Sequence, residues 1–384
     1  MKKKRKICFV LVNRANYGRV KLLMSEIKKN KNLELQIVLV SSPLLKKYGQ
    51  LDEVIKKDGF KINASFFTHV EGENLHTMTK STALCLLELS SCFRSLSPDI
   101  VFTIGDRYES LATAIAASYS NIYLCHLQGG ELSGSIDDKV RHAVTKLSNL
   151  HLVATERSKK IVKIMGENPK DVFNVGCPSI DLIKKINFKE KPDLSKYAYG
   201  VGHKMDLSSP YFVVLLHPVT TNYLKNLHLI KEVLKSVENL KTQIFWLWPN
   251  NDAGANFITK KIRSFRENNK DVKINFFTNL ETEDYLKLIK NCKCLIGNSS
   301  SGIRESAFLK IPTVNIGDRQ NRREKGNNVI DVDINSEKIL KAIKTISQRR
   351  IKKSKLYGDG NSTKKIIKIL SSIKLNNNKS FFIK

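Results

Sequence analysis

Residues 297–305 read GNSSSGIRE and gather groups that suit the binding of an anion. The three serines offer hydroxyl and main-chain N–H groups at the start of a predicted helix over 300–310. Such a start attracts anions through its unpaired N–H groups and the helix dipole, and the glycines let backbone approach a ligand. A capping serine explains only one of the three, and the GK[ST] ending of a Walker P-loop is absent. We interpret Ser299, Ser300 and Gly302 as parts of a phosphate-binding turn, with Glu305 as an acceptor for a ribose hydroxyl.

Other polar clusters follow apolar runs in the same way. Arg14 follows the first run, where a phosphate clamp would be needed, and His217 and Arg319 follow runs in the second half of the chain. Asp106 and Arg107 place an acid beside a base after a third run. Turns and caps alone do not call for Arg, His and Asp so often. The clusters are 13–19, 105–107, 126–131, 133–138, 141–142, 217–221, 249–254 and 317–320.

The apolar runs that must position these clusters alternate with helical stretches. They are apolar throughout, as in strands buried on both faces, so they predict a parallel sheet with helices on both sides. Ligands of such sheets bind at the carboxyl ends of the strands. The expected strands are 6–12, 33–40, 99–105, 121–127, 151–155, 172–176, 211–217, 243–249, 273–277, 293–297 and 313–317, and helices fit 76–96, 107–119, 222–239, 281–291, 300–310 and 362–374.

A polar segment with Gly and Pro, residues 186–210, interrupts the alternation and is interpreted as a linker. The prediction is therefore an α/β protein with two doubly wound, Rossmann-like domains that face each other across a cleft. The first would comprise residues 1–185 and the second, nucleotide-binding domain residues 186–361.

Composition narrows the class of protein. Hydrophobic residues make up 41% of the 384 residues, enough for two cores. The formal net charge is +30, but the lysines are scattered along the chain, which favours a solvated surface over nucleic-acid binding. Trp246 and Trp248 fall in an expected buried strand rather than among exposed basic residues.

The seven cysteines include no CxxC pair and lie mostly in apolar segments, so we expect reduced, buried thiols and no metal site. No apolar run reaches the roughly 20 residues that span a bilayer. The basic start resembles no cleavable signal, so we expect a first strand there, a cytoplasmic location and no membrane insertion.

In the polar clusters and the stretches around them, the chain resembles the hydrolysing nucleotide-sugar 2-epimerases of sialic and legionaminic acid biosynthesis. The resemblance implies a glycosyltransferase-B-like fold, no metal or other cofactor, and a homodimer or homotetramer. It also implies that the C-terminal helix, within 362–384, packs back on the first domain. The matching stretches are NRANYG, GDRYESLATAIAA, HLQGGELSGSIDDKVRHAVTKLS, GCPSID, HPVTT, PNNDAG, IGNSSSGIRES, IGDRQNRR and SKLYGDGN.

The family reaction inverts C2 of a nucleotide-linked 2-acetamido sugar and releases the free manno-configured sugar and the nucleoside diphosphate. Elimination to a 2-acetamidoglucal and rehydration require proton carriers and stabilisation of the departing diphosphate. The resemblance assigns proton transfer to Asp106 and Asp137. The other predicted site residues are Gln128, Glu131 and His217 in catalysis, and Arg14, Arg19, Arg107, His217, Asn250, Ser299, Ser300, Gly302, Glu305 and Arg319 around the nucleotide and its diphosphate.

Gln128 departs from the family pattern, in which many members have a carboxylate. An amide is no base at neutral pH. Either Gln128 only positions the sugar, or Glu131 takes part, or Asp106 or Asp137 alone is the base at C2.

The sugar and the carrier nucleotide stay open. General resemblance favours UDP- or GDP-N,N'-diacetylbacillosamine over UDP-N-acetylglucosamine, which would yield N-acetylmannosamine. No single residue of the sequence identifies the substituents at C4 and C6. The alternatives to an epimerase are a retaining glycosyltransferase of the same fold and a basic nucleic-acid-binding protein, which would bind with steep salt dependence.

Overall fold

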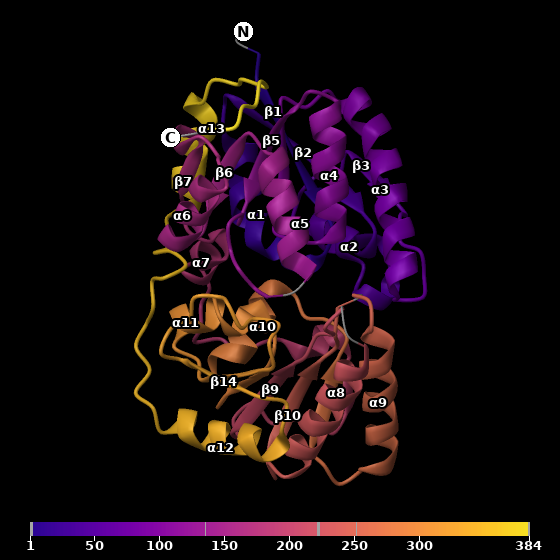
Figure 1. The fold of residues 1–384 in the computed structure, drawn as a ribbon. Coiled ribbons are helices and arrows are strands. Elements are labelled where there is room, and N and C mark those ends of the chain that lie inside the picture. Colours follow the sequence, from indigo (N-terminus) through magenta and orange to yellow (C-terminus); the bar gives the residue numbers. More distant parts are fainter. Residues whose placement is uncertain (1–2, 135, 221–222, 251, 383–384) are drawn as a thin grey trace.

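The computed structural model describes residues 3–134, 136–220, 223–250 and 252–382 (Figure 1). Three predicted clusters each have one residue outside this description, namely Ser135, Thr221 and Asn251. The chain forms two lobes, one above the other in Figure 1, and within the described residues each is built around a seven-stranded sheet.

The first sheet is parallel and has the order β3-β2-β1-β4-β5-β6-β7. The strand order reverses between β1 and β4, and a doubly wound sheet binds ligands at such a reversal. The residues that follow β1 and β4 therefore begin the site. The strands are β1 (Arg5–Leu11), β2 (Leu33–Val40), β3 (Ala64–Phe66), β4 (Ile100–Ile104), β5 (Tyr123–Leu127), β6 (Leu150–Val153) and β7 (Val172–Asn174).

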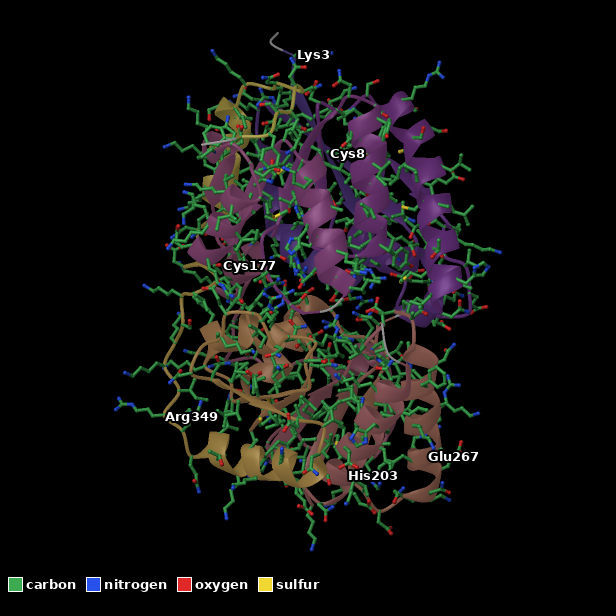
Figure 2. The ribbon with its side chains drawn as sticks, in the orientation of Figure 1. Lys3, Cys8, Cys177, His203, Glu267 and Arg349 are labelled. Atoms are coloured by element: carbon green, nitrogen blue, oxygen red, sulfur yellow. The ribbon has the colours of Figure 1, made fainter. Side chains whose placement is uncertain are left out.

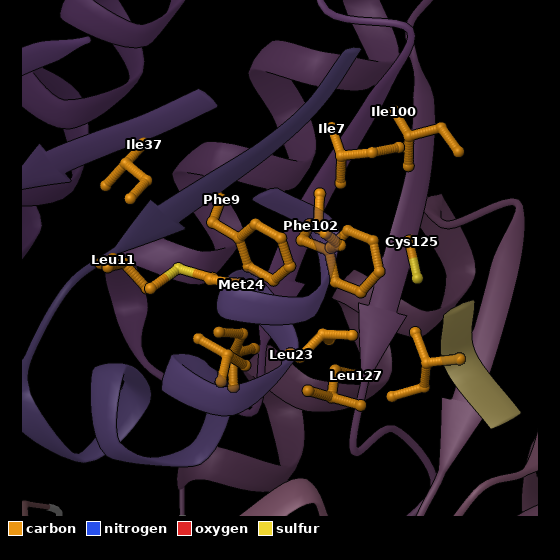
Figure 3. Packing of buried hydrophobic residues seen from close by; sticks show 14 of the residues in the cluster. Ile7, Phe9, Leu11, Leu23, Met24, Ile37, Ile100, Phe102, Cys125 and Leu127 are labelled. Atoms are coloured by element: carbon orange, nitrogen blue, oxygen red, sulfur yellow. The ribbon is translucent and has the colours of Figure 1, made fainter. Parts of the chain in front are cut away.

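Strand β1 shows why its sequence is apolar throughout. Ile7, Phe9 and Leu11 pack on one face of the sheet, and Phe9 stacks on Phe102 with ring centroids 4.6 Å apart (Figure 3). The alternate residues Cys8 and Val10 pack into the core on the other face. Both faces are covered by helices, namely α1 (Arg14–Lys29), α2 (Leu51–Lys57), α3 (Leu75–Leu96), α4 (Tyr108–Tyr119), α5 (Ile136–Leu147), α6 (Glu156–Ile164) and α7 (Pro178–Ile183).

The second sheet repeats this plan in the order β14-β13-β12-β9-β10-β11-β8. Here the order reverses at β9, so the residues after β9, β10 and β12 meet. The strands are β8 (Val201–Gly202), β9 (Tyr211–Leu215), β10 (Gln243–Leu247), β11 (Ile274–Phe277), β12 (Leu295–Gly297), β13 (Thr313–Ile316) and β14 (Val329–Val332). The helices are α8 (Tyr223–Glu238), α9 (Ala255–Asn268), α10 (Thr282–Lys290), α11 (Glu305–Leu309) and α12 (Ser336–Ser347).

The last helix, α13 (Ser362–Ser372), returns to the first lobe, as the resemblance implied. Ile366 and Leu370 join the core beside α1. The carboxylate of Asp181 accepts hydrogen bonds from the first N–H groups of the helix, Ser362 at 3.1 Å and Thr363 at 2.6 Å. This carboxylate fixes the start of α13 against α7.

Every predicted strand is present to within a few residues. Part of the predicted linker 186–210 is held on the second lobe: β8 pairs antiparallel with β11, and the amide of Asn275 donates to the carbonyls of Tyr199 and His203 at 2.8 and 2.7 Å. The prediction of a continuous helix over 300–310 is wrong, because the segment is broken into a 3₁₀ turn, Ser300–Gly302, and the five-residue α11. Its start is rich in Ser and Gly, which have low helix propensity.

Candidate active site

A cavity of about 320 Å³ lies between the lobes, at the carboxyl ends of both sheets. Figure 2 shows side chains of both lobes meeting in this region. Of the predicted site residues, Glu131 and Gly302 do not line the cavity. Those that do are Arg14, Arg19, Asp106, Arg107, Gln128, Asp137, His217, Asn250, Ser299, Ser300, Glu305 and Arg319.

Asp106 lies just after β4 and is held by two arginines. Its carboxylate accepts a hydrogen bond from Arg141 and lies 3.5 Å from Arg323. Burial opposes ionisation, but Arg141, Arg323 and Arg19 outweigh it and hold the pKa of Asp106 well below its usual value. Asp106 is therefore an anion at any pH near neutrality.

Arg141 links Asp106 to the loop before α5. Its side chain is almost fully buried and donates to Asp138 at 2.5 Å and to the carbonyl of Glu131 at 2.6 Å. His126 packs next to the loop that carries Asp106, with its Nε2 2.9 Å from the carbonyl oxygen of Gly105. Burial lowers the pKa of His126 to about 3, so this imidazole is neutral and its role is to hold the Gly105 backbone.

Asp137, at the start of α5, has a different environment. It forms an ion pair with Arg319 of the second lobe, at 3.8 Å. Burial and the negative charge of Asp106 raise the pKa of Asp137 to about 6, against the pull of Arg319. The two acids thus differ: Asp106 stays ionised, whereas Asp137 exchanges a proton near neutral pH.

Glu131 of the first lobe forms ion pairs with the second lobe. Its buried carboxylate contacts Arg323 and lies 2.6 Å from Arg304, both from the second lobe. A buried pair of this kind holds charges in place, because removing one partner leaves the other unpaired. Sequence reasoning missed these long-range partners, although Arg304 lies in GIRES and Arg323 in IGDRQNRR.

Gln128 lines the cavity and is 1% exposed. Its amide nitrogen donates to the sulfur of Cys177 at 2.9 Å, and among the described residues its carbonyl oxygen has no hydrogen-bond partner. Its φ is 71°, in the left-handed region that few residues other than Gly adopt. Gln128 can therefore bind a polar group of a ligand, but it carries no proton.

His217 follows β9 at the reversal of the second sheet. The side chain of Asn298 holds its backbone at both the N–H and the carbonyl, each at 2.8 Å, and the N–H of Asn250 donates to Nδ1 at 3.3 Å. Burial, reinforced by Arg319, lowers the pKa of His217 to about 3. His217 is thus a neutral donor whose Nε2–H is available to a ligand.

The serine turn differs from its prediction in one respect. Helix α11 has only five residues, so its dipole is weak, and the predicted anion site would depend on the hydroxyl groups and Arg319 instead. Tyr285 donates to Ser301 at 2.7 Å, and Arg319 donates to the carbonyl of Asn298 at 3.1 Å.

Close packing requires both glycines near this turn. A Cβ on Gly297 would lie 2.1 Å from the carbonyl oxygen of Leu215, and one on Gly302 would lie 2.8 Å from a methyl of Thr313. The approach of their backbone to a ligand stays a prediction.

The remaining arginines differ in their partners. Arg107 pairs with Glu109 at 3.0 Å and, across the lobes, with Asp252 at 2.5 Å. Arg14 donates to the carbonyl of Gly49 at 2.5 Å. Arg19 makes no hydrogen bond or ion pair with any described residue. Burial lowers the pKa of Arg14 and of Arg19 to about 10, so both remain cations at neutral pH.

Within the described residues no group of three or more His, Cys, Asp or Glu side chains could hold a metal ion, and no helix is long and apolar enough to cross a membrane.

Comparison with known proteins identifies the family. The sequence profile of the family described as UDP-N-acetylglucosamine 2-epimerase matches residues 25–371. The chain belongs to this family. It is 38% identical to the GDP/UDP-N,N'-diacetylbacillosamine 2-epimerase (hydrolyzing) of Campylobacter jejuni over 86% of the chain and 85% of that protein. It is 34% identical to the UDP-N,N'-diacetylbacillosamine 2-epimerase (hydrolyzing) of Legionella pneumophila, over 97% of each.

A solved structure of this family confirms the predicted fold. The UDP-GlcNAc 2-epimerase of Neisseria meningitidis, bound to UDP-GlcNAc, superposes with a TM-score of 0.80 at 17% identity and covers 96% of this chain and 100% of that one. The chain is thus an α/β enzyme of glycosyltransferase-B-like fold.

Proposed function

We propose that the protein hydrolyses the glycosyl bond of a nucleotide-linked 2-acetamido sugar and inverts C2. The preferred substrate is UDP- or GDP-N,N'-diacetylbacillosamine, and the product is free 2,4-diacetamido-2,4,6-trideoxymannose. The names of the relatives at 34–38% identity support this sugar. The observation that carries the proposal is the pair Asp106 and Asp137, in different ionisation states, opposite the donors of the second lobe.

The first step is an elimination in which Asp137 is the base. Its carboxylate takes the proton from C2, the C2–H electron pair forms the C1=C2 double bond, and the C1–O electron pair leaves with the diphosphate. The product is a 2-acetamidoglucal. A base with a pKa near the working pH suits this step, and Asp137 has one.

The second step is the addition of water. The water oxygen bonds to C1, and a proton from water reaches C2 on the face opposite to the one that lost its proton, while Asp137 returns the proton that it took to solvent. Asp106, kept anionic by Arg141, stabilises the positive charge that develops at C1 and orients the water.

The second lobe holds the leaving group. His217 and Arg319 donate to the diphosphate together with the hydroxyls of Ser299 and Ser300, and Arg14, Arg19 and Arg107 approach it from the first lobe. Asn250 and Glu305 bind the nucleoside. We also propose the division of the chain into domains at residues 185/186, with α13 added to the first.

The test is an incubation without any acceptor. Four substrates are compared, N,N'-diacetylbacillosamine and N-acetylglucosamine, each linked to UDP and to GDP, with release of nucleoside diphosphate and of free sugar measured together. We expect both products from at least one N,N'-diacetylbacillosamine donor. A preference for UDP-N-acetylglucosamine would favour the second candidate, which a relative of that name from Neisseria meningitidis, 30% identical, supports. A need for an acceptor would indicate a glycosyltransferase.

We further propose that the protein is a homodimer or a homotetramer in the cytoplasm. Large apolar side chains are exposed on and near α3, including Phe67 and Leu87 at 75% and 65%, and a second copy would cover them. Light scattering after gel filtration measures the mass directly, and a monomer at micromolar concentration would contradict this.

A further inference from the structure

Arg107 is held between two carboxylates, one from each lobe. It lies directly before α4, and Glu109 of that helix accepts hydrogen bonds from its Nε at 3.0 Å and its Nη2 at 3.3 Å. Asp252 of the second lobe, in the loop between β10 and α9, accepts a hydrogen bond from its Nη1 at 2.5 Å. One positive charge beside two negative charges leaves no net positive charge to attract an anion. Arg107 can therefore contribute charge to a diphosphate only if one of the two carboxylates gives way.

The two carboxylates differ in their freedom to move. Glu109 is fully buried in the first turn of α4. The side chain of Asp252 is 14% exposed, lines the cavity and belongs to a loop rather than to a helix. Without Arg107, Glu109 would be a buried charge with no access to water, which is costly, whereas Asp252 already contacts solvent. Asp252 is therefore the partner that a ligand can replace.

Asp252 also faces the other groups proposed to hold the diphosphate. Burial opposes its ionisation, but Arg107 and Arg319 outweigh burial and lower the pKa of Asp252 below its usual value. The charge of Asp252 also acts on His217, where it opposes the lowering of the imidazole pKa. One carboxylate thus lies within the electrostatic reach of Arg107, Arg319 and His217. A diphosphate that binds these three groups meets a negative charge that already interacts with them.

We propose that Asp252 is an internal competitor of the diphosphate: its carboxylate withdraws from Arg107 when the nucleotide binds and returns when the nucleoside diphosphate leaves. This inference rests on the proposed function and deepens it, because it assigns a residue to product release. Repulsion between the two anions lowers the affinity for the diphosphate, and the returning carboxylate gives Arg107 a partner as the product departs. No covalent bond forms or breaks in this exchange.

The experiment measures the affinity of UDP and of GDP by calorimetry, so it needs neither a sugar nor turnover. Asp252→Asn keeps the size of the side chain and removes its charge. This variant should lower the Kd by at least about 5-fold, the small end of the coupling typical of two linked binding events. Asp252→Ala should do the same, so the inference stays testable if Asp252→Asn does not fold.

Two controls separate competition from other effects of charge and shape. Asp252→Glu keeps the charge and should bind no more tightly than the wild type. Asp318→Asn removes a carboxylate that is next to Arg319 in sequence, pairs with Lys225 and does not line the cavity, so its Kd should stay close to that of the wild type. In a turnover assay, added nucleoside diphosphate should inhibit Asp252→Asn more strongly than the wild type, by the same factor as the change in Kd.

Unchanged or weaker binding of both nucleotides in folded Asp252→Asn and Asp252→Ala would overturn the inference. Equal tightening in Asp318→Asn would overturn it as well, because the effect would then come from net charge alone. Both results leave the proposed function intact. If the wild type binds neither UDP nor GDP, the proposed function fails and the inference falls with it.

Discussion

The two edges that enclose the cavity are built from the same kind of strand reversal but carry different chemistry. The edge of the first lobe holds Asp106 and Asp137, with Arg141 buried behind them. The edge of the second lobe holds His217, kept neutral by burial, and Arg319 among hydroxyl and amide groups. The proposed reaction assigns proton transfer to the first edge and most of the groups that hold the leaving group to the second, so both lobes complete the proposed site.

Substitutions of the two acids at the first edge should have the strongest consequences. Asp137→Asn removes the base and should lower kcat by roughly 10²- to 10⁴-fold, since general base catalysis contributes about that much. Asp106→Asn should also abolish turnover. Nucleoside diphosphate affinity, measured by calorimetry, should be largely retained in both, because neither acid is among the groups proposed to hold the diphosphate.

Asp138→Asn is the matched control for that pair. Asp138 is the neighbour of Asp137 and, like Asp106, pairs with Arg141, but it does not line the cavity. The Asp138→Asn variant should lose stability, whereas its kcat should change little. Wild-type rates in Asp137→Asn would refute the role given to it.

A substitution at the second edge should come next in magnitude. Arg319→Ala should weaken nucleoside diphosphate binding and cost about 2.7–4 kcal/mol of transition-state stabilisation, by analogy with the loss of one oxyanion donor. Titration with UDP and GDP measures the first quantity and kcat/KM the second. Lys225→Ala is the control, because Lys225 is another cation near this loop and forms an ion pair with Asp318. This variant should change neither the diphosphate affinity nor kcat/KM by more than a few-fold.

The pH dependence of the rate should show a smaller effect that distinguishes Asp137 from Asp106. Because the pKa of Asp137 is raised to about 6, its base form is lost as the pH falls, and log kcat/KM should decline with unit slope below about pH 6. Asp106 and His217 have lowered pKa values and should not titrate in that range. Arg319→Gln should move the decline to higher pH, since Arg319 opposes the shift. A pH profile without this limb would contradict the assignment.

Substitution of Gln128 should change the rate least. Gln128→Glu introduces the carboxylate that the family pattern has at this position, yet it should not raise kcat, because Asp137 and Asp106 already serve as the base and as the group that orients water. It should lower stability by about 1–3 kcal/mol, since the hydrogen bond to Cys177 is lost and a charge is buried. Chemical denaturation measures the stability, and a faster enzyme would show that the wild type lacks a base.

Much of this arrangement could be predicted from the sequence. Strands buried on both faces are apolar throughout, as β1 and β9 are, so their ends could be located, and the reversal of strand order brings those ends together. For that reason the apolar runs indicated that Asp106, His217 and Arg319 lie at strand ends, whereas the assignment of Asp137 depended on the family resemblance; all four line one cavity.

What depends on distant partners could not be predicted. Glu131 reads as a site acid in sequence, but its partners Arg304 and Arg323 come from the other lobe. The break in the helix after Ser300 and the pairing of β8 with β11 also depend on tertiary contacts. The difference between Asp106 and Asp137 arises from which arginines surround each of them, and spacing along the chain does not encode that.

The most direct test of the proposed elimination is hydrolysis in deuterium oxide, followed by NMR of the released sugar. If the C2 proton is removed and the new proton at C2 comes from water, every product molecule carries deuterium at C2. Retention of the original hydrogen at C2 would contradict this mechanism.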